Sequence, residues 1–293
     1  MKYTNGDNKR LIDFLIETQA DLSREKIKKA LRYGFVTCNG SVINKATTFL
    51  KKGDVVEVNF PKKQQINYKA KCPFKIAFED DYLIVMIKPA GILTIDYDKP
   101  DSNSFYHLAC EYIKEKTLGK QKLYIVHRLD REVSGLLVLA KSEIVRQALI
   151  DNWKNSRKKY YALVEGRPEK ESGTIATWLK ENEARMVYST SQQEDAKYAV
   201  THYKVINELP YHTLIDLELE TGRKNQLRVH MSDLGCPITG DRRYGSKDKF
   251  VRQIRLYSYS LAFTHPVTKE DIRIEMPLPG WFLQLKNENE DYK

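Results

Sequence analysis

The 293-residue sequence predicts an α+β protein with a mixed, largely antiparallel sheet, preceded by a small α+β unit. The candidate strands do not alternate regularly with helices, as they would around a parallel sheet. Neither GxGxxG nor GxxxxGKS/T occurs, which disfavours a fold that binds a nucleotide cofactor. Residues 1–71 hold 15 Lys and Arg against 7 Asp and Glu, and so +8 of the net charge of +10. This asymmetry separates a basic N-terminal segment from a nearly neutral remainder.

The first unit covers residues 9–60. Its residues 11–16 are apolar enough to predict a helix. Ser23 is a good N-cap for a second helix, which Gly34 would end. Two short strands are predicted after it, the first entering an Asn-Gly turn, at residues 35–40 and 55–58.

The second predicted helix carries a basic face. Arg24, Lys28 and Arg32 recur every four residues and therefore stack on one side, while Ile27 and Leu31 form a core face. Such a stripe suits a phosphate backbone. Charge alone does not decide between a polyanion-binding module and a merely soluble basic surface.

The remaining chain divides into a linker, a second domain and a tail. Residues 61–73 are polar and predict a linker, residues 286–293 predict a disordered tail, and the second domain lies between them at residues 74–285. Apolar runs predict buried strands at residues 82–87, 136–140 and 160–164, and alternation predicts a half-buried strand at residues 213–220. Helical spacing predicts helices at residues 105–116 and 143–153.

Several classes of protein are disfavoured. No apolar run reaches roughly 18 residues and the first residues lack an apolar signal region, so neither a membrane span nor a secretory signal is expected. The four cysteines stand far apart without a CxxC pair, which indicates reduced thiols rather than zinc or disulfides. The histidines show no HxxH or HExxH spacing. We therefore expect a cytoplasmic monomer without metal or cofactor.

Residues 127–141, with the sequence HRLDREVSGLLVLAK, are the strongest candidate for a reactive site. A polar loop that leads into a buried strand is a rigid mount for a carboxylate. Asp130 lies between Arg128 and Arg131, which would keep it ionised. From the charge pattern alone, however, a surface cluster of salt bridges is the better interpretation.

The literal string HRLDxxxSGLLxxAK resembles the signature of the RluA-type pseudouridine synthases. Further segments resemble other motifs of that family in the same order, at residues 80–85, 88–91, 159–166, 221–230, 240–245 and 263–266. The likeness covers nearly the whole second domain. In the first unit, residues 24–31, 34–40 and 52–56 resemble an S4-type RNA-binding domain, a common N-terminal partner in this family.

The resemblance implies a fold, a reaction and a site. Members of the family have a pseudouridine synthase fold with a catalytic cleft, and they convert uridine within RNA to pseudouridine by moving C1′ from N1 to C5. Asp130 matches the essential aspartate, Arg228 matches the arginine that holds its charge, and Tyr160 matches the tyrosine that packs on the base. Whether the carboxylate attacks the base, attacks C1′ or deprotonates the sugar stays open.

The same resemblance predicts RNA contacts. Arg128 would fill the space left by the extruded base. Further substrate contacts are predicted at His127, Arg223, Gln226 and Lys88, and contacts of the first unit at Arg24, Lys28 and Arg32. For Arg223 a salt bridge at a sheet edge is an alternative, and His127 and His230 are better suited to ordering loops than to acid-base chemistry. The expected RNA is that of the large ribosomal subunit, with transfer RNA second.

Some residues depart from the family pattern, and two other functions are open. The departures are Ile87, Val133, Asn225 and the pair Tyr257-Ser258. They affect substrate contacts more than catalysis, because none replaces Asp130, Tyr160 or Arg228. A non-catalytic RNA-binding or ribosome-assembly factor would be expected to have lost Asp130 or Arg228, and both are present. A hydrolase that uses Asp130 and His230 lacks a supporting nucleophile motif.

Overall fold

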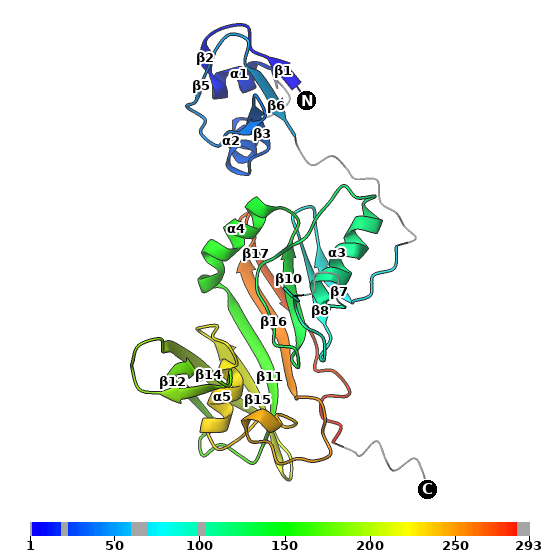
Figure 1. Cartoon of the computed structure of the whole chain (residues 1–293), viewed down its shortest axis with the longest axis vertical. Coiled ribbons are helices and arrows are strands. Elements are labelled where there is room, and N and C mark those ends of the chain that lie inside the picture. The colour runs from blue at the N-terminus through cyan, green and yellow to red at the C-terminus, as the bar shows by residue number, and fades with distance from the viewer. Residues whose placement is uncertain (1, 19–22, 60–69, 99–102, 286–293) are drawn as a thin grey trace.

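The computed structural model describes residues 2–18, 23–59, 70–98 and 103–285 in two parts, an N-terminal unit and a larger body (Figure 1). Most of the predicted linker and the whole predicted tail lie outside these residues. At the end of the predicted linker, Ala70 and Cys72 pack against the core of the body.

The N-terminal unit contains two helices and two small sheets. A four-stranded sheet has the order β1-β6-β3-β4, and β2 pairs with β5. The elements are β1 (Lys2–Thr4), β2 (Lys9–Arg10), α1 (Leu11–Thr18), α2 (Arg24–Arg32), β3 (Val36–Cys38), β4 (Ser41–Val42), β5 (Phe49–Leu50) and β6 (Val55–Val58). β1 precedes residue 9, where the sequence places the start of this unit, because a three-residue strand is too short to give a periodic signal.

Helix α2 has the ends that its sequence predicts. The Ser23 hydroxyl accepts a hydrogen bond from the Lys26 N–H at 3.3 Å, and Gly34 leaves the helix with a φ of 69°. Ile27 and Leu31 are buried in the core of the unit. Arg24, Lys28 and Arg32 are exposed, which leaves the predicted basic face open to solvent.

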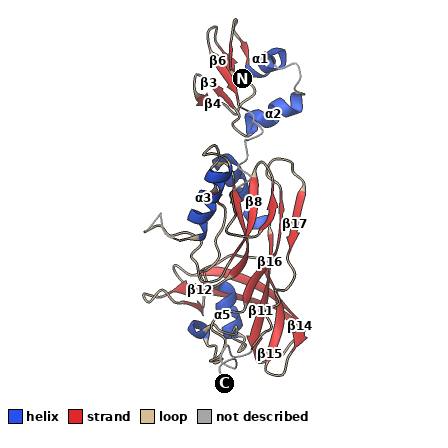
Figure 2. Cartoon of the chain, turned by 90° about the vertical axis from the view of Figure 1, so that its right-hand side faces the viewer, coloured by secondary structure: helices blue, strands red, loops and turns tan. Residues whose placement is uncertain are grey.

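The body is built on one large, mainly antiparallel sheet, as predicted (Figure 2). The main path has the order β13-β12-β14-β15-β11-β16-β10-β8-β7, with β17 beside β16 and β9 beside β10. Only β10 and β16 pair in parallel among the described strands. The strands are β7 (Ile76–Glu79), β8 (Leu83–Lys88), β9 (Tyr124–Ile125), β10 (Ser134–Ala140), β11 (Arg157–Glu165), β12 (Ser172–Glu181), β13 (Val187–Thr190), β14 (Lys197–Glu208), β15 (His212–Leu219), β16 (Leu256–Thr264) and β17 (Asp271–Glu275).

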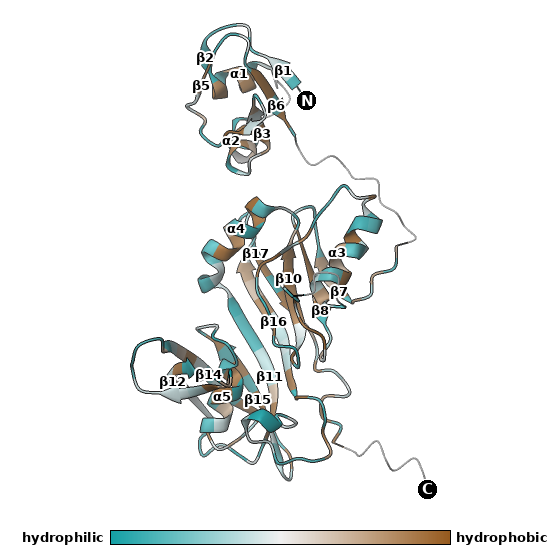
Figure 3. Cartoon of the chain, in the orientation of Figure 1, coloured by the Kyte–Doolittle hydropathy of each residue, from teal (hydrophilic) through white to brown (hydrophobic). Residues whose placement is uncertain are grey.

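Strand β10 carries the centre of the core. All seven of its residues are buried, since Leu137 and Leu139 pack in the cluster that contains α3 (Phe105–Lys116), while Leu136 and Val138 pack in the cluster that contains α4 (Glu143–Asn152). Covering on both faces explains a continuous apolar run without alternation. Figure 3 shows the hydrophobic strands β8 and β10 between more hydrophilic helix surfaces. No described helix is long and apolar enough to cross a membrane.

Helix α5 (Gln226–Asp233) lies at the other end of the sheet from α3 and α4 (Figure 1). The sequence interpretation did not predict it. Its first six residues, Gln226 to Met231, are all buried, including polar ones. A helix that is buried around its whole circumference has no hydrophobic period to reveal it. This helix brings Arg228 into the body.

Candidate active site

The described residues form a cleft of about 890 Å³ on one face of the large sheet. The three predicted catalytic residues, Asp130, Tyr160 and Arg228, line it together. They come from the loop before β10, from β11 and from α5, which are far apart in the sequence. Of the predicted RNA contacts, the cleft is also lined by Arg128, His127, Arg223 and Gln226, but not by Lys88 or by the basic face of α2.

The loop that carries Asp130 is held rigidly by the loop at residues 89–94. The Thr94 hydroxyl donates to the carbonyl oxygen of Leu129 at 2.6 Å and accepts from the Leu129 N–H at 3.1 Å. The Gly91 N–H donates to the Arg131 carbonyl at 2.8 Å, and the Arg131 guanidinium donates back to the Gly91 carbonyl at 3.0 Å. The backbone on both sides of Asp130 is therefore fixed.

Gly135 lets this loop enter the sheet. It pairs with Ser258 of β16, and a Cβ at Gly135 would overlap the carbonyl oxygen of Ser258. Its φ of 127° is also one that side-chain-bearing residues rarely adopt. The glycine of the SG pair is thus required by a close approach of two backbones.

Lys88 has a structural role, and its predicted contact with RNA is wrong. The side chain is fully buried, and its ammonium donates to the carbonyl oxygens of Pro89 at 2.9 Å, Ile92 at 2.9 Å and Arg131 at 3.2 Å. Burial lowers the pKa of Lys88 to about 8, against the opposing charges of nearby carboxylates. Lys88 therefore holds together the loop at residues 89–94 and the loop that carries Asp130, without lining the cleft.

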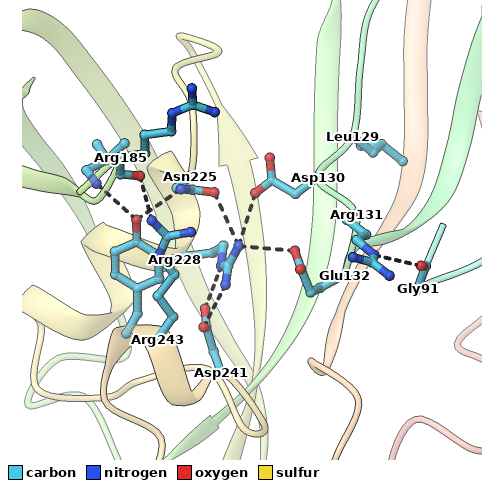
Figure 4. A network of polar contacts seen from close by, with 12 residues as sticks. Gly91, Leu129, Asp130, Arg131, Glu132, Arg185, Asn225, Arg228, Asp241 and Arg243 are labelled. Atoms are coloured by element: carbon cyan, nitrogen blue, oxygen red, sulfur yellow. Dashed lines mark hydrogen bonds and ion pairs between the residues drawn. The ribbon is translucent and has the colours of Figure 1, made fainter. Parts of the chain in front are cut away.

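Arg228 is the centre of the polar network (Figure 4). Asp241 accepts two hydrogen bonds from its guanidinium, at 2.6 and 2.8 Å, and the side chains are only 6% and 1% exposed. One guanidinium nitrogen, Nη1, lies 3.5 Å from a carboxylate oxygen of Asp130 and 3.5 Å from one of Glu132. One cation is thus fixed by one carboxylate and shared by two others.

The pKa of Asp130 is raised from its ordinary value. Burial against the cleft wall is the main cause, the positive charge of Arg228 opposes it, and the negative charge of Glu132 adds to it. The side chain is still 31% exposed, toward the cleft. Asp130 is therefore a carboxylate that is accessible to a ligand and depends on one guanidinium for its ionised form.

The neighbours of Asp130 in the sequence do not hold its charge, contrary to the sequence interpretation. Arg131 points away toward the Gly91 carbonyl (Figure 4). Arg128 is exposed on the cleft wall and forms no ion pair with a described residue. The cation beside Asp130 comes from 98 positions later in the chain, at Arg228.

Tyr160 faces the cleft, and its neighbour Tyr161 faces the other side of the sheet. Tyr160 is buried in the main core, while Tyr161 stacks on Tyr259 with ring centroids 3.7 Å apart. This alternation is the one expected along a strand. Burial, together with the charge of Asp130, raises the pKa of Tyr160 to about 12, so the phenol stays protonated at neutral pH.

Two further predicted RNA contacts use their polar atoms inside the protein instead. The amide of Gln226 donates to the Val200 carbonyl at 2.9 Å and accepts from the Thr221 hydroxyl at 2.8 Å. His127 accepts a hydrogen bond from the Val138 N–H at 3.1 Å, and its ring stacks on Trp153. Burial lowers the pKa of His127 to about 3, which keeps it neutral. Both residues order loops, which for His127 is the role that the sequence favoured.

Arg223 lies at the rim of the cleft. Its guanidinium donates one hydrogen bond to the Tyr198 carbonyl at 2.9 Å and forms no ion pair with a described residue. The alternative of a sheet-edge salt bridge is therefore wrong. Together with exposed Arg128, Arg223 supplies positive charge where a phosphate backbone could approach the cleft.

Three residues of the network, Glu132, Asp241 and Tyr244, had no role in the sequence interpretation, and Asn225, expected to affect substrate contacts, is buried beside Arg228 instead. Asn225 adopts a φ of 53° before α5, accepts from Arg228 at 3.2 Å and donates to the Tyr244 hydroxyl at 3.0 Å. The Tyr244 ring lies 5.0 Å from the Arg228 guanidinium. Asp241 lies in a segment that resembles one of the family's motifs. This position could have indicated that Asp241 matters, but not that its partner is Arg228.

His230 does not support a hydrolase. It is fully buried, with its two ring nitrogens bonded to the hydroxyls of Thr201 at 2.9 Å and Thr177 at 3.0 Å. Burial lowers the pKa of His230 to about 4. It does not line the cleft, so it cannot exchange a proton with a ligand beside Asp130.

Comparison with known proteins agrees with this geometry. The sequence pattern of the family described as RNA pseudouridylate synthase matches residues 82–233. An uncharacterized RNA pseudouridine synthase of Bacillus subtilis, YlyB, is 31% identical, over 95% of this chain and 93% of that protein. The ribosomal large subunit pseudouridine synthase D of Vibrio vulnificus is 32% identical, over 94% and 89%, and synthase C of Rickettsia typhi is 32% identical, over 93% and 95%.

The fold is also found among solved structures. Human RNA pseudouridylate synthase domain containing 4 superposes with a TM-score of 0.59 at 24% identity, over 71% of this chain and 90% of that one. The fold of the second domain agrees with the one that the resemblance implies. Because the family pattern and relatives more than 30% identical each cover most of this chain, it belongs to the RNA pseudouridylate synthase family and is a pseudouridine synthase acting on RNA.

Proposed function

We propose that this synthase isomerises a uridine of large-subunit ribosomal RNA, with Asp130 as the catalytic carboxylate. The observation that carries the catalytic part is the ion pair of Asp130 with Arg228 in the cleft beside Tyr160. Two of the relatives are named as ribosomal large subunit synthases, which favours ribosomal over transfer RNA as the substrate.

The isomerisation needs a carboxylate that stays ionised beside a bound base. The bond from N1 to C1′ breaks, C5 joins C1′, N1 gains a proton and C5 loses one. Arg228 supplies the positive charge that favours the ionised form of Asp130 in its partly buried site. The neutral ring of Tyr160 belongs to the core and also lines the cleft, where it offers a surface on which the uracil can stack.

The substrate is identified by mapping. The gene is deleted in its host, and pseudouridine is mapped across ribosomal and transfer RNA. Loss of one or more sites in large-subunit RNA supports the proposal. Loss only in transfer RNA would replace the proposed substrate. Loss of no site, together with no activity of the purified protein, would leave the non-catalytic RNA-binding alternative.

The N-terminal unit is proposed to bind RNA as an S4-type domain through the basic face of α2. Replacing Arg24, Lys28 and Arg32 together by Gln should weaken RNA binding and reduce the salt dependence of the binding constant, because fewer counterions are released. The measurement is affinity for a ribosomal RNA fragment as a function of salt. A triple variant on another exposed basic set, Lys2, Lys45 and Lys52, is the control. Equal slopes for all three proteins would refute this role.

Glu132 should tune the pH dependence of the reaction. Its negative charge raises the pKa of Asp130 and competes for the same guanidinium nitrogen. Glu132→Gln therefore lowers the pKa of Asp130. Since the reaction needs the ionised carboxylate, the acidic limb of the single-turnover rate profile should move to lower pH.

The control for this experiment is Glu183→Gln, which removes an exposed carboxylate that does not line the cleft. It should leave the profile in place. A shift of the Glu132→Gln profile to higher pH, or no shift, would contradict the shared-guanidinium arrangement.

A further inference from the structure

Lys158 is a buried cation that the network around Asp130 does not use. It is only 7% exposed, lies two residues before Tyr160 on the same face of β11, and lines the cleft. Two residues along a strand span roughly 6–7 Å, so its Cα lies about one nucleotide away from the position of Tyr160.

The polar contacts of the Lys158 ammonium that the structure describes are weak. Its ammonium donates one long hydrogen bond, to the Trp153 carbonyl at 3.3 Å, and lies 5.7 Å from the centre of the Trp153 ring. Within the described part of the chain, no Asp or Glu oxygen forms an ion pair with it. Burial alone lowers its pKa. A buried ammonium is costly unless an anion completes its environment.

The neighbours of Lys158 show that this arrangement is specific to the cleft face. Arg157 and Lys159 project to the opposite face of β11, where Arg157 bonds Glu218 at 2.8 Å and Lys159 bonds Asp216 at 2.9 Å. The three consecutive basic residues therefore differ in their ion pairing. Arg157 and Lys159 pair with carboxylates, whereas Lys158 on the cleft face has no carboxylate partner among the described residues.

We propose that Lys158 binds a phosphodiester oxygen of the RNA strand next to the target uridine and so positions that nucleotide over Asp130 and Tyr160. This inference rests on the proposed function. A phosphate is the anion that every RNA substrate brings into the cleft, whatever its sequence. Lys158 is a positioning residue, because its ammonium reaches the RNA backbone rather than the reacting atoms.

The test uses Lys158→Met in the full chain, with Lys159→Met as a matched control on the outer face. The probe is an RNA fragment, transcribed in vitro, that contains the uridine found by the deletion map. For Lys158→Met, we expect KM to rise about 10- to 100-fold, the size of one charge-assisted hydrogen bond, with kcat little changed. The salt slope of binding should fall by about one. Lys158→Arg should restore most of the affinity.

A synthetic RNA with one neutral methylphosphonate linkage separates a phosphate contact from damage to the fold. Placed in turn at each linkage flanking the uridine, it should weaken binding of the wild type and of Lys159→Met at one position. At that position it should leave Lys158→Met unaffected. Additive losses at every linkage, or wild-type KM and salt slope for Lys158→Met, would overturn the inference while the synthase remains active. A wild-type protein that forms no pseudouridine would overturn the proposed function, and this inference with it.

Discussion

Asp130→Asn is expected to abolish pseudouridine formation while the protein stays folded and still binds RNA. Losing an essential catalytic group commonly costs on the order of 10⁴-fold or more in rate. The fold should be spared, because Arg228 keeps its two hydrogen bonds to Asp241 when the carboxylate of Asp130 becomes an amide. A third of the Asp130 side chain is exposed, so the change in unfolding free energy should stay below about 1 kcal/mol.

The measurement is single-turnover formation of pseudouridine in the mapped RNA, with thermal unfolding and RNA affinity measured beside it. Glu132→Gln is the matched variant, since it removes the other carboxylate that shares the same guanidinium nitrogen. It should keep activity near neutral pH. If Asp130→Asn retained activity within about tenfold of the wild type, the catalytic carboxylate would have to be another residue.

The sequence predicted two helices and four strands of the body, but it gave no ranges for β7, β9, β12, β13, β14, β16 and β17. The helix predicted at residues 105–116 is α3, and the strand predicted at residues 136–140 lies within β10. Helix α5 was missed because its first six residues are all buried and show no period. Pattern reasoning depends on a contrast between an inner and an outer face, and α5 has none.

The motifs named the residues of the candidate site and the pairing of Asp130 with Arg228, but not the other contacts around them. The motifs identified Asp130, Tyr160 and Arg228, and the structure brings them to one cleft. They did not reveal which polar side chains face the ligand. Lys88 and Gln226 also lie in segments that resemble the family's motifs, yet the Lys88 ammonium bonds backbone carbonyls and the Gln226 amide bonds Val200 and Thr221. Only the fold decides whether the polar group of a residue forms hydrogen bonds within the protein or faces into the cleft.

Lys158 illustrates the opposite case. The sequence places it among three basic residues, where charge alone gives no reason to prefer one. The strand alternates their directions, and the positions of Asp216 and Glu218 on β15 decide which charges are neutralised. Long-range pairing of this kind is not encoded in any local pattern.

Substitutions of Arg228 and Asp241 should be strongly coupled in their effects on the unfolding free energy, but not in their effects on catalysis. Arg228→Met leaves Asp241 as a buried carboxylate without a cation, and Asp241→Asn leaves Arg228 with less compensation. Breaking a buried pair in this way should lower the unfolding free energy by about 3–5 kcal/mol in each single variant.

The double variant should be much less destabilised than the sum of the two, because no uncompensated charge remains buried. Its activity should nevertheless stay lost, since Asp130 then has no guanidinium at 3.5 Å to keep it ionised. Denaturant unfolding of the four proteins of the cycle, with pseudouridine formation measured on each, tests both parts. Additive destabilisation would mean that Asp241 does not hold Arg228 as an ion pair. An active double variant would mean that Asp130 needs no cation, and that Arg228 supports only the fold.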